Sequence, residues 1–264
     1  MSGPQHGFEL VNLRDDTILV RCASHLEQGA TAWFEDAFAA IGALGEPWGD
    51  IRVLGRSGAT PALGPLASVL GSAPPPRASV ASRTSRSVVG WTLGPHPYTS
   101  DEVATLDVRL DLERWHEIGV DRWTALVEDL LVRLSPRWLF SELTNLHLAQ
   151  NSPGLANGSA FGVDLGRFAS APPGREWNLG AERFGAAWMT WHSDAFEARL
   201  EFDARPAVEA STAIAGGTLY RLYADPAFGL TEAGLERQQA FSNGVGYREF
   251  AHAHRKVWGY WQRT

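Results

Sequence analysis

The stretch TLDVRLDLERWHEIGVDRWTALVEDLLVRLSPRW, residues 105–138, decides the fold. It opens with strict alternation: every second residue from Leu106 to Leu112 is apolar, and the residues between them are the charged Asp107, Arg109 and Asp111. Successive side chains of a β-strand point to opposite faces, so this pattern predicts a strand with one buried and one solvated face. We therefore expect a sheet at the centre of the fold.

A helix is predicted directly after this strand, from Val120 onward. Its apolar side chains recur at helical spacing and form one stripe: Trp123, Val127, Leu130, Leu131 and Leu134. Asp121 is a suitable N-cap, and Pro136 lies just past the end of the stripe. The stretch thus predicts a strand followed by an amphipathic helix whose stripe packs against the sheet.

The same pattern occurs earlier in the chain, offset by 90 residues. A β-branched, apolar strand is expected at Thr17–Ser24, and a helix within Thr31–Trp48. The matching pairs are Trp33 and Trp123, Ala37 and Val127, Ala40 and Leu130, Ile41 and Leu131, Leu44 and Leu134, and Trp48 and Trp138. Because both tryptophans match along with the stripe, we predict a duplicated strand–helix–strand unit. Two unrelated amphipathic helices are the alternative.

Such a duplication predicts an α+β fold of ferredoxin-like units, in which an antiparallel sheet carries helices on one face. We expect a single domain over residues 1–264. The first unit would span about residues 15–100, and the second, residues 101–264, would add a C-terminal hairpin and helices.

The segment GAAWMTWHSDAFEARLEFDARP, residues 185–206, is dense in histidine and acid. Its second half alternates from Phe196 to Asp203 and predicts a strand with a charged outer face. The preceding AWMTW is then the partner strand, and HSD is the turn. We predict that Trp191, His192 and Asp194 bind a protein partner at the exposed tip of this hairpin. The alternative is that His192 and Asp194 form a catalytic dyad or two metal ligands, but no third ligand accompanies them.

Other candidate groups favour structural roles. His252 and His254 would share a face in a strand, but the surrounding sequence is typical of a helix, where they point about 200° apart. Cys22 is the only cysteine and is expected to be a buried strand thiol. No nucleotide-binding loop, nucleophile elbow or zinc motif occurs. We therefore assign no catalytic, cofactor-binding or metal-binding residue, expect no cofactor, and do not expect an enzyme.

Composition limits the partners. The 264 residues are 44% hydrophobic, and the net charge of −7 argues against nucleic-acid binding, which needs a cationic surface. The same charge would favour encounter with a basic protein. No apolar run approaches the ~18 residues of a membrane span, and the first residues lack the features of a secretory signal. We expect a cytoplasmic protein that does not bind membranes.

The order of elements resembles the bacterial type VI immunity family. Residues 105–138 are similar to the middle of that family, and LEQGATAWFEDAFAAIGALG (residues 26–45) to its first helix. GAAWMTW resembles its tryptophan-bearing strand, and GGTLYRLYADPAF and YREFAHAHRKVWGYW its closing strand and C-terminal helix. The stretch between Leu54 and Val88 has no counterpart. The resemblance implies a non-enzymatic protein that binds a cognate toxin or effector and neutralises it.

Two other functions remain open. A duplicated α+β unit can enclose a cavity, so the chain is alternatively a small-molecule-binding protein or an enzyme with a His/Asp site. A structural or regulatory subunit is the third reading, and the sequence does not separate it from the first.

Overall fold

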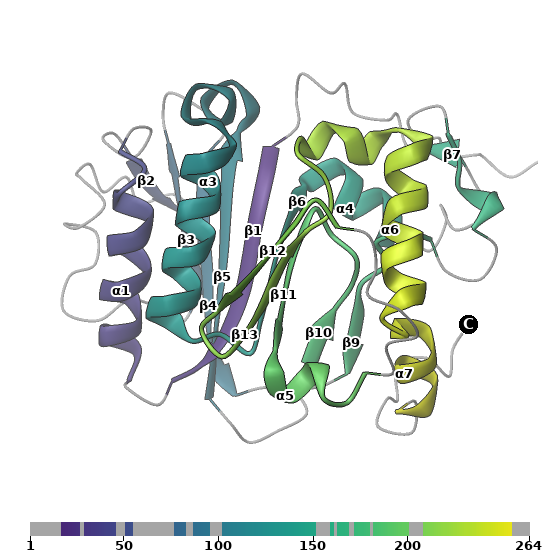
Figure 1. Ribbon diagram of the computed structural model, residues 1–264. Helices are drawn as coiled ribbons and strands as arrows, with labels where there is room; N and C mark the ends of the chain where they lie inside the picture. Colours follow the sequence, from purple (N-terminus) through teal and green to yellow (C-terminus); the bar gives the residue numbers. More distant parts are fainter. Residues whose placement is uncertain are drawn as a thin grey trace, which may run out of the picture.

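The computed structural model describes residues 17–26, 29–45, 51–54, 77–82, 87–95, 102–151, 159–160, 163–168, 172–179, 182–200 and 208–254 (Figure 1). Nine strands form one sheet: β1 (Thr17–His25), β2 (Ile51–Leu54), β3 (Arg77–Ser82), β4 (Val88–Pro95), β5 (Glu102–Asp111), β6 (Trp138–Leu143), β11 (Met189–Ser193), β12 (Ala210–Ile214) and β13 (Gly217–Arg221). Four shorter strands form two small hairpins: β7 (Ser159–Ala160) with β8 (Val163–Asp164), and β9 (Trp177–Leu179) with β10 (Glu182–Phe184).

The helices are α1 (Ala30–Gly42), α3 (Leu112–Leu134), α4 (Thr144–Asn151), α5 (Asp194–Glu197), α6 (Glu232–Gly244) and α7 (Tyr247–Ala253), with 3-10 turns η3 (Leu165–Arg167) and η4 (Pro226–Leu230). None of the helices in the described ranges combines the length and the apolarity that crossing a membrane requires.

The large sheet is antiparallel throughout, in the order β12-β13-β11-β6-β1-β5-β4-β3-β2. The central strand β1 lies between β5 and β6, so its residues are paired on both sides. Val20, for example, lies opposite Val108 of β5 and Ser141 of β6. The predicted α+β class, with helices packed against an antiparallel sheet, is confirmed.

Helices α1 and α3 cover one face of this sheet side by side (Figure 1). Both predicted stripes are buried there, together with Ile18, Val20 and Cys22 of β1 and every second residue of β5 from Ala104 to Leu110. The Trp123 indole is fully buried, and its Nε1 donates a hydrogen bond to Ser141 Oγ at 2.9 Å. Cys22 lies on the same face, and burial raises the pKa of its thiol to about 12, as fits the expected inert strand thiol.

Helix α3 begins earlier than the sequence pattern indicates. The Asp111 carboxylate accepts a hydrogen bond from Glu113 N at 3.0 Å and caps the helix, so Leu112 is helical and not part of the strand. Gly119 interrupts the helix with φ 74° and ψ 169°, a backbone conformation that favours glycine. The amphipathic part predicted from Val120 follows this break.

The opposite face carries α4 and α6 over the other half of the sheet. Glu142 follows Ser141 in β6 and therefore points away from α3. Its carboxylate is buried and accepts hydrogen bonds from Leu143 N at 2.9 Å, Trp188 N at 3.0 Å and Gln238 Nε2 of α6 at 2.8 Å. The sequence predicted helices on one face, and the structure adds these on the other.

The hairpin predicted within residues 185–206 is wrong. Ser193 Oγ accepts a hydrogen bond from Phe196 N at 3.1 Å, and the chain turns into the short helix α5 instead of a second strand. Strand β11 pairs with β13, where Trp191 lies opposite Leu219. Glu201 and Asp203 lie outside the described residues. Trp48, one residue of the duplicated pattern, also lies outside them, so the duplication and the unit boundaries stay predictions.

Candidate functional site

Trp191 and His192 lie in β11 and are buried, with 4% and 1% of their surface exposed. Trp191 Nε1 donates a hydrogen bond to Ile214 O at 3.1 Å, which ties β11 to the β12–β13 hairpin. The expectation that this tryptophan is exposed at a hairpin tip is therefore wrong. Asp194, the first residue of α5, is exposed. A role of these three residues in partner binding stays a prediction.

His192 sits inside a cage of four aromatic rings: Phe196, Tyr220, Phe241 and Tyr247. Its Nε2 is 2.5 Å from the Tyr247 hydroxyl of α7. Its Nδ1 lies 3.7 Å from Glu197 Oε1, which accepts a hydrogen bond from the Tyr220 hydroxyl at 2.6 Å. The carboxylate beside the His192 imidazole is therefore that of Glu197 and not that of Asp194, the other member of the candidate dyad.

Burial lowers the pKa of His192, and the neighbouring Glu197 opposes this only in part. Burial also raises the pKa of the Tyr247 hydroxyl well above its usual range. A neutral imidazole and a neutral phenol in a sealed aromatic cage hold α7 against β11. The arrangement is that of a packing contact between β11, α5, α6 and α7.

His252 lies in the last turn of α7, in the predicted helical conformation, and His254 is the residue that follows the helix. His252 is exposed, whereas His254 stacks on Phe250 with ring centroids 4.1 Å apart. Within the part of the chain that the structure describes, no group of three side chains is placed to hold a metal ion.

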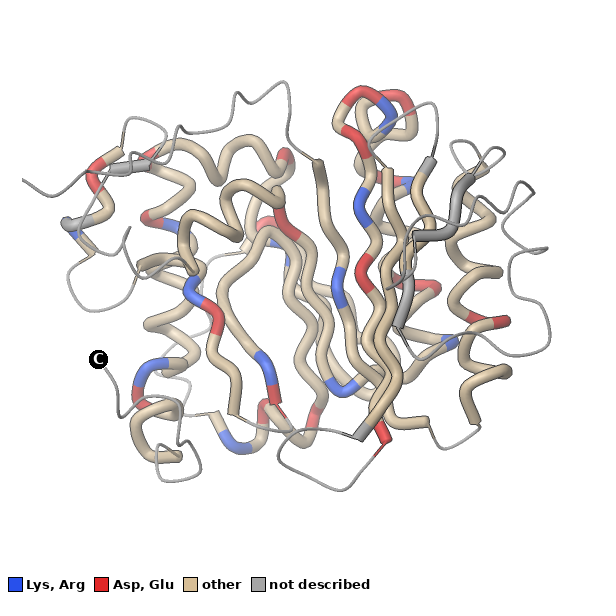
Figure 2. The backbone as a smooth tube through the Cα atoms, turned by 180° about the vertical axis from the view of Figure 1, so that it is seen from behind, with Lys and Arg blue, Asp and Glu red and all other residues tan. Residues whose placement is uncertain are grey.

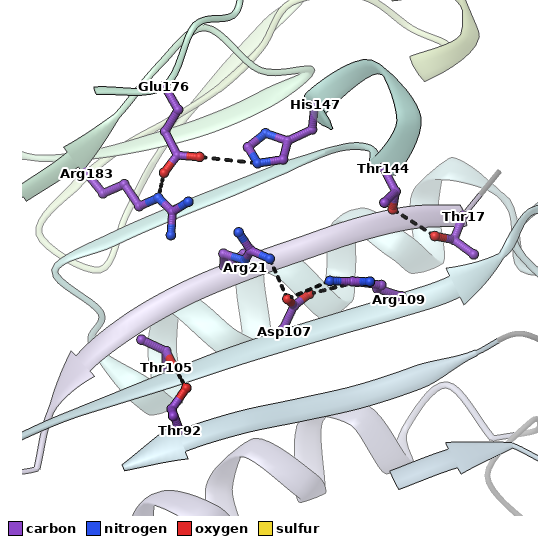
Figure 3. Close-up of polar contacts among 10 residues, drawn as sticks. All are labelled: Thr17, Arg21, Thr92, Thr105, Asp107, Arg109, Thr144, His147, Glu176 and Arg183. Atoms are coloured by element: carbon purple, nitrogen blue, oxygen red, sulfur yellow. Dashed lines mark hydrogen bonds and ion pairs between the residues drawn. The ribbon is translucent and has the colours of Figure 1, made fainter. Parts of the chain in front are cut away.

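A second candidate site, which the sequence did not predict, lies on the face of β1 and β5 opposite α1 and α3 (Figure 2). Arg21 and Asp107 face each other in the β1–β5 ladder, and Arg21 Nη2 donates to Asp107 Oδ2 at 2.5 Å. Arg109, two residues along β5, donates to the same carboxylate from Nε at 3.3 Å and from Nη2 at 3.1 Å. One aspartate thus holds two arginines (Figure 3).

The β9–β10 hairpin and α4 add three more titratable side chains beside them. Glu176 pairs with Arg183 of β10, and its Oε2 lies 3.2 Å from His147 Nε2 of α4. The Arg183 guanidinium lies 5.2 Å from the ring centroid of Trp138 in β6. We call the six residues Arg21, Asp107, Arg109, His147, Glu176 and Arg183 the charged face.

The pKa values show how closely these groups interact. The pKa of His147 falls to about 3, through burial first and then through Arg21 and Arg183, so its imidazole is neutral at neutral pH. Burial and the neighbouring Arg21 lower the pKa of Arg183 to about 9. Burial raises the pKa of Asp107, but Arg21 and Arg109 outweigh that effect and lower it overall. The charged face therefore holds three cations and two anions.

Comparisons with known proteins show a likeness of fold. The sequence matches no protein-family model and no curated protein. The structure is similar to that of the Pseudomonas aeruginosa T6SS protein PA0821, with a TM-score of 0.51 and 13% sequence identity. The likeness covers 88% of this chain and 72% of that protein. The two chains thus share the arrangement of their elements, and T6SS denotes the type VI secretion system.

Proposed function

We propose that this protein is of immunity type and neutralises a cognate type VI toxin or effector by binding it. The observation that carries the proposal is the fold shared with a T6SS protein over most of the chain. The resemblance of residues 26–45 and 105–138 to the type VI immunity family supports it independently.

Binding would block the toxin by steric occlusion and requires no catalysis by this chain. The candidate dyad gives little support to an enzyme, because His192 is sealed among aromatic rings while Asp194 lies on the surface. Arg21, Asp107 and Arg109 of the charged face are partly exposed and stand on β1 and β5, each paired on both sides, so they offer a rigid surface to a partner. The net charge of −7 would speed encounter with a basic toxin.

We place the protein in the cytoplasm, in agreement with a single reduced cysteine that is buried. Toxicity can be measured with the product of the neighbouring gene, expressed either in the cytoplasm or with a periplasmic signal, with and without this protein. We expect rescue of growth in the cytoplasmic arm and a stable complex by size-exclusion chromatography.

Trp123→Ala, which is expected to lower the stability of the fold, serves as the control that rescue depends on the folded protein. A non-toxic neighbour, or a toxic one that neither binds nor is neutralised, would contradict the proposal. Rescue in the periplasmic arm alone would contradict the cytoplasmic location but not the binding function.

A further inference from the structure

We infer that the charged face is a docking surface for an acidic segment of a protein partner, whose carboxylate binds between Arg21 and Arg183. The inference rests on the proposed function for the identity of the partner. It rests on the structure for the place and chemistry of the contact.

The charges of this surface favour an anionic ligand. Three guanidinium groups face two carboxylates here, in a protein whose net charge is −7. Asp107 is shared by Arg21 and Arg109, and Glu176 by Arg183 and His147. The neutral imidazole adds no charge, so the guanidinium groups among these six residues outnumber the carboxylates by one. Asp111, on the same side of β5, is engaged as the N-cap of α3. An added carboxylate would pair with the guanidinium groups.

The positions of Arg21 and Arg183 leave a place for a carboxylate between them. In Figure 3 the guanidinium groups of Arg21 and Arg183 point toward one another, from β1 and from the β9–β10 hairpin. They are close enough that Arg21 lowers the pKa of Arg183. A guanidinium has five N–H donors in a planar fork that suits a carboxylate. An anion between the two would replace their repulsion by two attractive contacts.

The side chains of this surface are ordered and accessible before a partner binds. The side chains of Arg21, Asp107 and Arg183 are 20%, 23% and 25% exposed, so each is held in place yet reachable. Arg183 also lies over Trp138, which is itself half-buried. Arginine and tryptophan are enriched among residues that dominate binding energy, and groups ordered in advance lose little entropy on binding.

Gly90 of β4 provides a way to crowd the charged face beside Asp107 without removing a charge. It lies opposite Asp107 in the β4–β5 ladder, so a side chain added there stands on the charged face. A Cβ atom at this position would meet Asp107 Cβ at 3.9 Å and Ser79 Cβ at 3.8 Å, both ordinary contacts. Valine also suits a strand. Gly90→Val should therefore fold and cover part of the surface.

The first experiment uses the free protein and acetylated hexaglutamate as probe. Titration at low salt is followed by the NMR signals of the arginine Nε–H groups. We expect the signals of Arg21 and Arg183 to shift, and that of Arg133, on α3 at the opposite face, to stay. No shift at Arg21 and Arg183 would overturn the inference. Preferential binding of single-stranded DNA of equal charge would also overturn it, in favour of a nucleic-acid site.

The second experiment uses the complex with the toxin from the co-expression test. The double variant Arg21→Gln/Arg183→Gln should weaken binding about tenfold or more, and Gly90→Val should weaken it with all charges kept. Arg133→Gln is the matched control and should bind as the unchanged protein does. Melting temperatures identify any variant that fails to fold.

The outcomes separate the two proposals. A complex that both Gly90→Val and the double variant leave intact overturns the docking surface and leaves the immunity function standing. Specific hexaglutamate shifts without any toxin complex overturn the immunity function and leave the charged face as an acidic-segment site.

Discussion

The two faces of strands β1 and β5 differ in what they contact. On one face Val20 and Cys22 of β1, with Leu106 and Val108 of β5, lie against α1 and α3 with no charged group among them. On the other, one residue along each strand, Arg21 and Asp107 form a half-exposed ion pair. The same backbone thus supports an apolar layer that packs against two helices and a polar layer of ion pairs. The proposed docking surface lies in the polar layer.

The largest effect is expected from the apolar face. Trp123→Ala removes a fully buried indole and leaves Ser141 Oγ without its donor. Loss of a buried tryptophan costs about 3–5 kcal/mol in the free energy of unfolding. Urea denaturation followed by circular dichroism measures this loss. A loss under about 1 kcal/mol would contradict the importance given to this face.

The buried carboxylate of β6 is expected to come next. Glu142→Gln preserves the side-chain volume but replaces one acceptor oxygen with an amide NH₂. In place of Oε1 the NH₂ would face the donor Leu143 N, and in place of Oε2 it would face the donors Trp188 N and Gln238 Nε2. A buried donor without an acceptor costs about 2–3 kcal/mol. Urea denaturation at pH 7 tests this, with the exposed Glu236→Gln as control. Equal stability of the two variants would contradict a structural role of Glu142.

The pH dependence of the free energy of unfolding tests the protonation state of His147 in the charged face. His147 binds its proton near pH 6.5 when unfolded and only near pH 3 when folded, so acid favours the unfolded state between these values. Between pH 7 and pH 5 we expect the free energy of unfolding to fall by about 2 kcal/mol from this residue, at about 1.4 kcal/mol for each pH unit below 6.5. The free energy of unfolding, measured by urea denaturation at several pH values, should depend less on pH in this range in the variant His147→Gln. An unchanged slope in that variant would contradict a neutral, buried His147.

The smallest effect is expected at the exposed edge of the charged face. Arg109→Gln leaves Asp107 paired with Arg21, and the side chain of Arg109 is 41% exposed. Water and salt screen such a pair, so the free energy of unfolding should change by less than about 1 kcal/mol. Arg133→Gln, with the same exposure and an ion pair to Asp129 on α3, is the matched control. A loss much larger than that of the control would show that the charged face stabilises the fold.

Local patterns were enough to predict the layer in which helices pack on one face of the sheet. The alternation around Asp107 and the stripe from Trp123 to Leu134 predict which side chains are buried, because both periods are properties of single elements. The pattern also marked Asp107 and Arg109 as outward-facing. It did not indicate that Arg21, 86 residues away, would meet Asp107.

The alternation from Phe196 misled for the same reason. A period of two is compatible with a strand, but the Ser193 cap and the pairing of β11 with the distant β13 turn the chain into α5. Trp191 then contacts the β12–β13 hairpin, whereas His192 contacts α6 and α7, so the burial of both depends on segments far away in the sequence. The residue pattern around His192 therefore does not predict these contacts.

The sequence by itself therefore determined the α+β class, the buried stripes and the polar side of β5. Those features follow from the repeat of side-chain direction within a helix or strand. Only the tertiary structure decided that β1 lies between β5 and β6, that His192 is sealed by α7, and that Arg21 and Arg183 come together. Strand order and register depend on packing between segments far apart in the chain, which no local period encodes.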